Sequence, residues 1–352
     1  MNSVPKKPTV AIDAMGGDIG VAVTVSAAVD YLNNIDATNK KIILVGDEDA
    51  ISAEIKAVNG DNLVAKGRIE IVHTTEVVGM DESPALALKR KKDSSMRVAI
   101  NMVKEGRSQA AVSAGNTGAL MATAKFVLKT IKGVDRPAII TTLPCRDTSK
   151  TMHMLDLGAN VDSSPEMLLQ FAIMGSVLTE FVDKKKNPKV ALLNVGAEEI
   201  KGSEKVKKAA SLLENSELNY AGYIEADEIY DGKVDVIVTD GFEGNVALKA
   251  SEGTAKMIMG VMKEEFKRNP FTKLAAVVCM KVLKSMQKRL DPRAHNGATL
   301  IGLNGVVVKS HGGTDSFGFK HAIAEAFSQT ERDVVGHLHH TFESFSNEIS
   351  DN

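Results

Sequence analysis

The stretch AAVSAGNTGAL, from Ala110 to Leu120, decides the fold class of this chain. Its first residues, 110–113, are apolar or small without interruption, which is typical of a strand covered on both faces of a sheet. Small and polar residues follow at 114–118, and Asn116 or Thr117 is suited to cap a helix that begins there. We therefore interpret the stretch as a strand, a glycine-containing turn and a helix in direct succession.

The same kind of unit recurs along the chain. Apolar runs that we expect to form strands lie at Val10–Ile12, Lys41–Val45, Ile69–Val72, Ala138–Leu143, Met152–Leu157, Lys189–Asn194 and Val234–Thr239. Strands that alternate with helical patterns predict an α/β fold with a doubly wound, largely parallel sheet. Ligands of such sheets bind at the carboxyl ends of the strands, so the loops directly after the strands are the ones to search.

Residues 255–293 break this alternation and predict a protruding helical hairpin. Two helical stretches, Ala255–Arg268 and Thr272–Arg289, flank Asn269-Pro270, and the proline ends or sharply turns the chain there. We expect this excursion to make a dimer contact, a membrane contact or both.

Two further strands are expected near the C-terminal end. Ala298–Leu303 and Val306–Lys309 flank Asn304-Gly305, and Asn-Gly suits the type I′ turn of a hairpin. Neither an internal repeat nor a low-complexity linker interrupts the chain, so we expect residues 1–352 to form a single catalytic α/β unit.

Composition excludes several classes of protein. The formal net charge is −2, aromatic residues make up 4% and Trp is absent, all of which argue against a nucleic-acid reader. Cys145 and Cys279 have no metal-type spacing and are expected to be reduced thiols of a cytoplasmic protein. We expect no signal peptide in Met1–Thr9, and no run reaches the roughly 18 apolar residues that span a membrane.

Two glycine-containing loops are candidate anion sites. Gly16, Gly17 and Asp18 follow the first strand, and adjacent glycines let the backbone approach a ligand closely. The start of the helix near Asn116–Gly118 is the stronger candidate, because free N–H groups and the helix dipole attract anions. The alternatives are an ordinary turn and tight helix packing. Neither loop has the pattern of a nucleotide-binding or dinucleotide-binding loop.

Four polar residues in other loops after strands are candidates for chemistry. Asn245 suits a carbonyl oxygen that becomes negative, and Lys201 suits a phosphate or an oxyanion. His311 is the best general acid or base, since its ordinary pKa lies near neutrality. Asn160 precedes the next helix cap and is a candidate for binding substrate. The alternatives are a helix cap for Asn245, a solvated side chain for Lys201 and a structural role for His311.

A basic cluster precedes the predicted strand at 110–113. Its members are Lys89, Arg90, Lys91 and Lys92, with Arg97 nearby. A run of charges is often only a solvated helix face, and the alternative is a docking site for an acidic protein or a phosphate group.

Taken together, these segments resemble the bacterial acyl-acyl carrier protein:phosphate acyltransferases. The matching segments are AIDAMGGD from Ala11, ESPALALKRKKDSSMRV from Glu82, VSAGNTGAL from Val112, LDLGANVD from Leu155, EEIKG from Glu198, DGFEGNV from Asp240 and GLNGVV from Gly302. They extend over nearly the whole chain in the right order. The chain departs from the family pattern at Ile19–Val21 and at Asp291–His295.

The resemblance implies transfer of a long-chain acyl group from acyl carrier protein to inorganic phosphate, forming acyl phosphate for phospholipid synthesis. It also implies a homodimer, a fold similar to isocitrate and isopropylmalate dehydrogenases, and no metal or nucleotide cofactor. Where those dehydrogenases carry metal-binding aspartates, this chain has Asn245 and Lys249. An amide and an ammonium group cannot replace two hard anionic ligands.

The expected mechanism is mainly positioning, because phosphate itself is the nucleophile. We assign the helix start at Asn116–Gly118 and Lys201 to phosphate or oxyanion, Asn245 to the thioester carbonyl and His311 to proton transfer. The acidic carrier protein is expected to dock on Lys89–Lys92 or on the basic hairpin.

The hairpin carries charge and apolar groups together. Nine Lys and Arg residues stand against two Glu residues at 256–290, a local charge of +7. Its tip contains Phe266, Phe271, Leu274 and Val278 among lysines, which suits an anionic membrane surface as well as a dimer interface. A cytoplasmic enzyme that is peripheral on the inner face of the membrane would release its product beside a membrane glycerol-3-phosphate acyltransferase.

Two other functions compete with this interpretation. One is a phosphotransacetylase that uses coenzyme A, which shares the chemistry. The other is a non-catalytic module that binds lipid or phosphate, which phosphate-dependent release of thiol would exclude.

Overall fold

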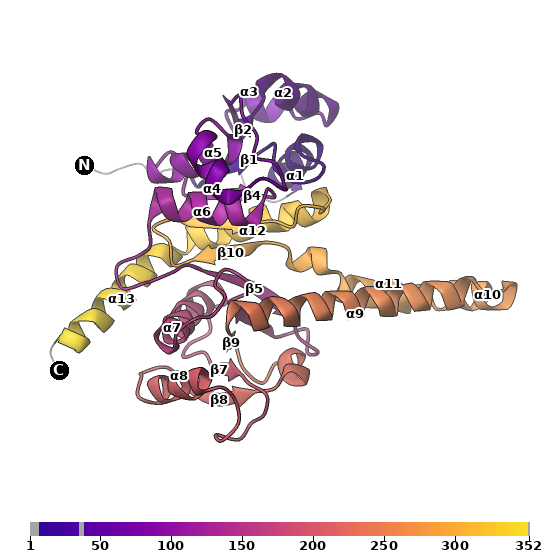
Figure 1. The fold of residues 1–352 in the computed structure, drawn as a ribbon. Helices are drawn as coiled ribbons and strands as arrows, with labels where there is room; N and C mark the ends of the chain where they lie inside the picture. The colour runs from indigo at the N-terminus through magenta and orange to yellow at the C-terminus, as the bar shows by residue number, and fades with distance from the viewer. Residues whose placement is uncertain (1–6, 35–38, 351–352) are drawn as a thin grey trace.

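The computed structural model of the chain describes residues 7–34 and 39–350, arranged around one 11-stranded sheet (Figure 1). Most of the segment 1–9, in which no signal peptide is expected, lies outside the described residues. The strand order is β3-β2-β1-β4-β11-β10-β5-β6-β9-β7-β8. The strands are β1 Thr9–Asp13, β2 Lys41–Gly46, β3 Ile69–His73, β4 Ala110–Ser113, β5 Ala138–Pro144, β6 Thr151–Leu155, β7 Val190–Leu193, β8 Tyr220–Ile224, β9 Val236–Val238, β10 Ala298–Ile301 and β11 Val306–Lys309.

Helices cover both faces of this sheet, so the predicted doubly wound α/β fold is confirmed. The helices are α1 Val21–Asn34, α2 Glu48–Ala57, α3 Asp61–Ala65, α4 Pro84–Arg90, α5 Ser95–Lys104, α6 Thr117–Leu128, α7 Pro165–Val182, α8 Glu204–Glu214, η1 Ala226–Asp231, α9 Gly241–Lys267, α10 Pro270–Val278, α11 Met280–Leu290, η2 Pro292–His295, α12 Ser316–Glu331 and α13 Val334–Ser350. Val10 and Ile12 pack with α1 and α12, whereas Ala11 packs with α5 and α6. Both faces of β1 are therefore buried, which explains its continuous apolar run.

The strands of the sheet run in two directions. β10 is antiparallel to both β11 and β5, and β5 is antiparallel to β6. As a result β1–β4, β11 and β5 run one way, while β10 and β6–β9 run the other. The runs at 138–143 and 152–157 do not repeat the strand–turn–helix unit but form an antiparallel pair, because the connection at 145–150 is too short for a crossover helix.

The predicted C-terminal hairpin is confirmed as β10 and β11, but its predicted type I′ turn is wrong. The loop between the two strands covers 302–305, and the positive φ angle in it belongs to Gly302, at +93°. The Asn304 Nδ2 group instead donates hydrogen bonds to the carbonyl oxygens of Leu128 (3.1 Å) and Thr130 (2.9 Å). Contact with the end of α6 therefore decides the shape of this loop.

The helical excursion forms an arm of α9, α10 and α11 that projects from the body of the molecule (Figure 1). The predicted start of its first helix at Ala255 is wrong, since α9 begins at Gly241 directly after β9 and runs for 27 residues. The break at Asn269-Pro270 is confirmed: the Asn269 side chain accepts a hydrogen bond from Thr272 N at 3.0 Å and caps α10.

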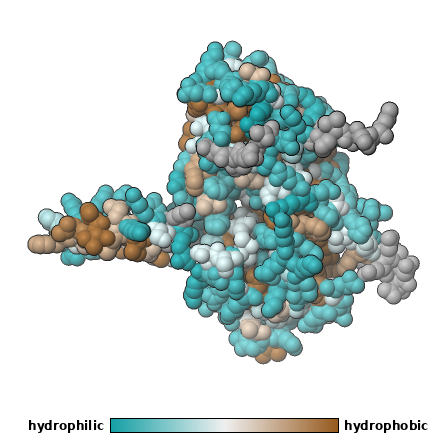
Figure 2. Space-filling view, turned by 180° about the vertical axis from the view of Figure 1, so that it is seen from behind, coloured by the Kyte–Doolittle hydropathy of each residue, from teal (hydrophilic) through white to brown (hydrophobic). Residues whose placement is uncertain are grey.

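Hydrophobic groups gather on this arm (Figure 2). Phe271 is 84% exposed, Val278 78% and Leu274 64%, while Phe266 is half-buried. Of the helices that the structure describes, none is both long and apolar enough to cross a membrane.

Candidate functional site

Three loops that follow β1, β4 and β11 meet at one point, which we call the three-loop junction (residues 13–18, 113–118 and 310–314). Asp18 N donates a hydrogen bond to the Gly312 carbonyl oxygen at 2.9 Å. A Cβ atom on Gly17, whose φ is +99°, would lie 3.0 Å from both Ala114 Cβ and Gly312 O. A Cβ atom on Gly16 would lie 2.9 Å from Gly115 N. Gly16 and Gly17 thus allow the loops to close on one another.

The buried carboxylate of Asp13 lies beneath this junction. Ser95 Oγ and Ser113 Oγ each donate a hydrogen bond to it at 2.6 Å. Burial outweighs these hydrogen bonds and raises the pKa of Asp13. Asp13 is not among the site residues predicted from the sequence. It could have been found as the polar residue that ends the first apolar run.

The start of α6 contributes N–H groups to the junction. Asn116 is the helix cap, since its Oδ1 accepts from Ala119 N at 3.0 Å. Its Nδ2 donates to the carbonyl oxygens of Met80 (2.8 Å) and Glu82 (3.0 Å), so the side chain is occupied within the fold. The N–H groups of Thr117 and Gly118 have no acceptor within the part of the chain that the structure describes. They are the groups available to an anion at this helix start.

Gly118 also has a packing role. A Cβ atom there would lie 2.8 Å from Pro84 Cγ at the start of α4. The tight helix packing that the sequence left open as an alternative is thus present at Gly118, next to the anion-facing N–H groups.

His311 lies exposed on the third loop of the junction. Its backbone N donates to Asn296 Oδ1 at 3.0 Å, and its Nδ1 accepts from Gly313 N at 3.2 Å. With Nδ1 as acceptor, the neutral ring carries its proton on Nε2, which makes that nitrogen a hydrogen-bond donor. Partial desolvation and the ammonium groups of Lys249 and Lys309 lower the pKa of His311. These effects favour the neutral ring more than in a free imidazole.

Asn245 lies exposed in the first turns of α9, beside Gly158 in the loop after β6. A Cβ atom on Gly158 would lie 3.4 Å from Asn245 Cβ. Asp240 caps the helix by accepting from Phe242 N at 2.9 Å, so the alternative of Asn245 as the cap is wrong. The Asn245 amide forms no hydrogen bond with the described residues and remains available to a ligand.

Helix α9 connects the loop after β6, beside which Asn245 lies, to the three-loop junction. Lys249 follows Asn245 by four residues and therefore lies on the same helix face. The Lys249 charge lowers the pKa of both His311 and Lys309, which places it near the three-loop junction. The face of α9 thus extends from the loop after β6 to the junction, although β6 and β11 run in opposite directions.

Two glycines hold the start of α9 against the loop after β6. A Cβ atom on Gly241 or Gly244 would overlap the carbonyl oxygens of Asn160 and Asp156, respectively. The Asn160 Nδ2 group donates to Pro137 O (2.8 Å) and to Asp156 (2.9 Å), and the residue is buried. The structure gives the Asn160 side chain a role in holding this loop, and its role in binding substrate stays a prediction.

Lys201 stands apart from the other candidates. Its ammonium group pairs with Glu198 at 2.8 Å, and this hydrogen bond raises the pKa of Lys201. The loop is fixed by Asn194 Nδ2, which donates to Gly196 O (3.0 Å) and Lys201 O (3.3 Å). No contact with Asn245 or the junction is present among the described residues, so the role of Lys201 in binding phosphate stays a prediction.

The basic cluster lies at the end of α4, close to the junction. Lys89, Arg90 and Lys92 are exposed, whereas Lys91 pairs with Glu82 at 2.7 Å. Glu82 also accepts the Asn116 hydrogen bond through its carbonyl oxygen, which connects the cluster to the start of α6.

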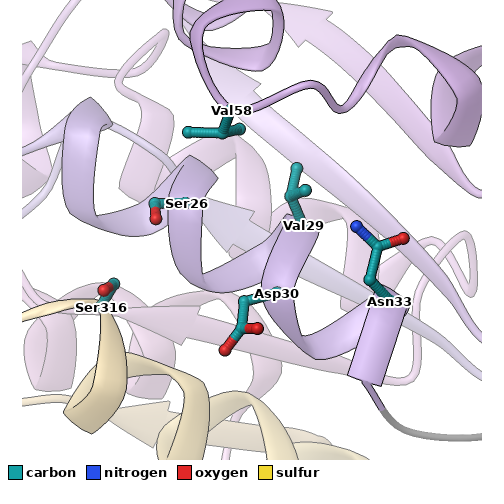
Figure 3. A pocket seen from close by; sticks show the side chains of 6 residues that line it. All are labelled: Ser26, Val29, Asp30, Asn33, Val58 and Ser316. Carbon is teal, nitrogen blue, oxygen red and sulfur yellow. The ribbon is translucent and has the colours of Figure 1, made fainter.

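Two hollows of the described structure lie away from these residues. One, of about 440 Å³, lies between α1 and the start of α12 (Figure 3) and is lined by Ser26, Val29, Asp30, Asn33, Val58 and Ser316. The other, of about 260 Å³, lies between η2 and α12 and includes His295, His321 and Glu325. The described residues contain no group of three or more His, Cys, Asp or Glu side chains placed to hold a metal ion.

Comparisons with known proteins identify relatives of the chain. Residues 8–337 match the family model described as "Fatty acid synthesis protein". A phosphate acyltransferase of Chromobacterium violaceum is 56% identical over 330 residues, which are 94% of each chain. One of Legionella pneumophila (strain Paris) is 52% identical over 344 residues, 97% of this chain and 98% of the relative.

Solved structures show a shared fold. A phosphotransacetylase from Streptococcus pyogenes superposes with a TM-score of 0.61 at 15% identity, covering 93% of this chain and 95% of the other. The EutD phosphotransacetylase from Staphylococcus aureus gives 0.59 at 18% identity, covering 92% and 94%. At such identities the similarity concerns the fold alone.

Proposed function

Because the chain belongs to the phosphate acyltransferase family of fatty acid synthesis, we propose that it transfers a long-chain acyl group from acyl carrier protein to inorganic phosphate. The observation that carries this proposal is the face of α9, where the Asn245 amide lies along one helix face with Lys249, which approaches the three-loop junction. A carbonyl-binding amide and an anion site are the two elements that the reaction needs.

In the proposed reaction a phosphate oxygen attacks the thioester carbonyl carbon and forms a C–O bond. The tetrahedral intermediate then breaks its C–S bond. The proton of hydrogen phosphate passes to the leaving sulfur, so that the products are acyl phosphate and the free thiol of the carrier. The reaction requires no nucleophile from the protein, and catalysis rests on positioning and on stabilisation of the oxyanion.

The Asn245 amide donates to the carbonyl oxygen as it becomes negative. The N–H groups of Thr117 and Gly118 receive the phosphate, closed in by the Gly16–Asp18 loop. His311 donates from Nε2, and we propose this role instead of general base because Gly313 N occupies Nδ1. Lys201, from the loop after β7, adds a positive charge when the substrate is bound.

Acyl carrier protein is the proposed donor partner, and the exposed cations Lys89, Arg90 and Lys92 are its proposed docking site. The cluster is joined to the start of α6 through Glu82, so a carrier bound there would have its thioester close to the phosphate. Electrostatic docking of this kind weakens as salt rises.

The exposed apolar groups of the arm support a homodimer contact or a contact with the inner face of the cell membrane. Sedimentation of the full chain alone and with anionic vesicles distinguishes the two. A dimer that leaves vesicles in solution assigns the arm to the subunit interface, whereas co-sedimentation assigns it to the membrane, beside a membrane glycerol-3-phosphate acyltransferase.

A phosphotransacetylase acting on a coenzyme A thioester is the second candidate, favoured by the shared fold. Acetyl-coenzyme A and palmitoyl-acyl carrier protein, each supplied with phosphate, separate the two, with acyl phosphate followed by phosphorus NMR. We expect acyl phosphate from the carrier thioester and at most a trace from acetyl-coenzyme A. The reverse preference would replace the proposed donor.

A further inference from the structure

Lys309, at the end of β11, is the only Lys or Arg side chain that is buried in the described part of the chain, with 9% exposed. Lysines are rarely buried without a partner of opposite charge. The Lys309 Nζ group donates to the carbonyl oxygen of Ala114 at 3.1 Å and also to that of Ser310. No described carboxylate lies within ion-pair distance of it, so the structure itself leaves this charge without an anionic partner.

This ammonium group lies directly at the three-loop junction. Lys309 is paired with Ser113 in the register of β11 and β4, at the carboxyl end of both strands. Its two carbonyl acceptors belong to two of the three converging loops. The charged or titratable groups that face it are Asp13 and Asp18 from the first loop, His311 from the third loop and Lys249 from α9.

The number of hydrogen bonds points to a ligand. An ammonium group has three N–H donors, and two of those of Lys309 are taken by carbonyl oxygens. The third has no acceptor among the described residues, and the N–H groups of Thr117 and Gly118, which belong to the same three-loop junction, also lack acceptors there. An anion there would supply the ion-pair partner at close range that the described residues do not, and a partly buried site strengthens that attraction relative to water.

We propose that Lys309 is a binding residue for the tetrahedral oxyanion acceptor, with the N–H groups of Thr117 and Gly118 as its partners on the same anion. The inference rests on the proposed function, in which inorganic phosphate is the acceptor. It assigns phosphate affinity, and not recognition of the acyl donor, to Lys309.

The position also makes phosphate binding sensitive to pH. Burial lowers the pKa of Lys309 to about 8, partly offset by Asp13 and Asp18. The folded protein therefore loses this charge as pH rises through about 8, well below the ordinary value of 10.5. Phosphate only becomes more negative as pH rises, so a loss of phosphate affinity at higher pH comes from the protein.

The test compares the full-length Lys309→Met and Lys309→Arg variants with wild type, and Lys66→Met serves as an exposed control. Binding of inorganic phosphate is measured by calorimetry without any acyl donor, and the KM values for phosphate and for the carrier thioester are measured separately. We expect Lys309→Met to weaken phosphate binding and raise the phosphate KM by about tenfold or more. The thioester KM stays within about twofold, and Lys309→Arg recovers part of the loss.

A correctly folded Lys309→Met variant whose phosphate affinity and phosphate KM match wild type would overturn the proposal. If that variant does not fold, the wild-type pH series decides: affinity that falls between pH 7.5 and 9.5 supports the proposal, and a flat profile contradicts it. Phosphate binding that depends on Lys309 without acyl transfer would refute the proposed function and leave this inference standing. Phosphate-dependent acyl transfer with an unchanged phosphate KM in Lys309→Met would support the proposed function and refute this inference.

Discussion

The role proposed for Asn245 depends on its amide group. The Asn245 side chain is a neutral hydrogen-bond donor that is exposed on α9 and forms no hydrogen bond with the described residues. A neutral donor stabilises an oxygen that gains negative charge without binding an anion tightly beforehand, which is what differential stabilisation of the transition state requires.

We predict that Asn245→Ala lowers kcat by about 10²-fold, the effect expected for the loss of one oxyanion donor. Asn245→Asp is expected to be worse, because a carboxylate repels the developing charge. Phosphate-dependent thiol release measures both, with Thr254→Ala on the exposed side of the same helix as control. An Asn245→Ala protein that folds normally and turns over like wild type would remove Asn245 from the site.

The pKa of His311 can be used to test whether α9 lies near the three-loop junction. The positive charge of Lys249 lowers the pKa of His311, so Lys249→Met is expected to raise that pKa toward the ordinary value of 6.5. It stays below 6.5, because partial burial, the larger cause, is unchanged. Proton NMR titration of the imidazole measures this, with Lys263→Met on the distal part of α9 as control. A His311 pKa that does not respond to Lys249 would place α9 away from the junction.

At the scale of residues the sequence selects candidate groups but does not show their hydrogen bonds. Asn245, His311 and the start of α6 could be selected as candidates because each follows a predicted strand. The sequence did not show that the Asn116 and Asn160 amides donate to the carbonyl oxygens of Met80 and Pro137, and ligand binding by these two residues stays a prediction. Those acceptors come from distant segments, which no local pattern reveals.

At the scale of elements, α9 depends on close backbone contact at its start. A Cβ atom on Gly244 would overlap the Asp156 carbonyl oxygen, whereas one on Gly253, further along the same helix, meets nothing within 4 Å. The two glycines therefore form a matched pair for mutation.

We predict that Gly244→Ala destabilises the protein by about 3 kcal/mol, since overpacking against backbone cannot relax easily. Gly253→Ala is expected to stabilise it by up to about 1 kcal/mol, because alanine is the better helix former. Urea unfolding of both variants measures the difference. Equal effects of the two substitutions would mean that the start of α9 does not pack as described.

The elements themselves could be predicted where their signals are local. The Asn269-Pro270 break and the hairpin of β10 and β11 are confirmed because proline geometry and apolar runs act within a few residues. The start of α9 and the loop at 302–305 could not be predicted, since the cap at Asp240 and the contacts of Asn304 depend on tertiary partners.

At the scale of the molecule, alternating strands and helices predicted the α/β class, but not the strand order or the change of direction at β10. The antiparallel pairing of β10 with β5 joins segments that lie far apart in the sequence, and such a pairing carries no local sequence signal. The positions of Asn245 and His311 relative to each other depend on this strand arrangement and on the length of α9.

Docking of the carrier protein belongs to this scale, because it uses surface charge. We predict that a combined Lys89→Glu, Arg90→Glu and Lys92→Glu variant raises the KM for acyl carrier protein by about tenfold at low salt, with a smaller difference at high salt. The phosphate KM is expected to stay unchanged. A matched charge reversal at Lys263, Lys267 and Arg268 on the arm is the control. If the arm variant alone raises the carrier KM, docking belongs to the arm.

The most direct test of the proposed acyl transfer measures release of free thiol from palmitoyl-acyl carrier protein, with and without inorganic phosphate and with no metal added. We expect release that depends on phosphate, with one acyl phosphate formed for each thiol. No release, or release at the same rate without phosphate, would contradict it and leave hydrolysis or simple binding as the function of this site.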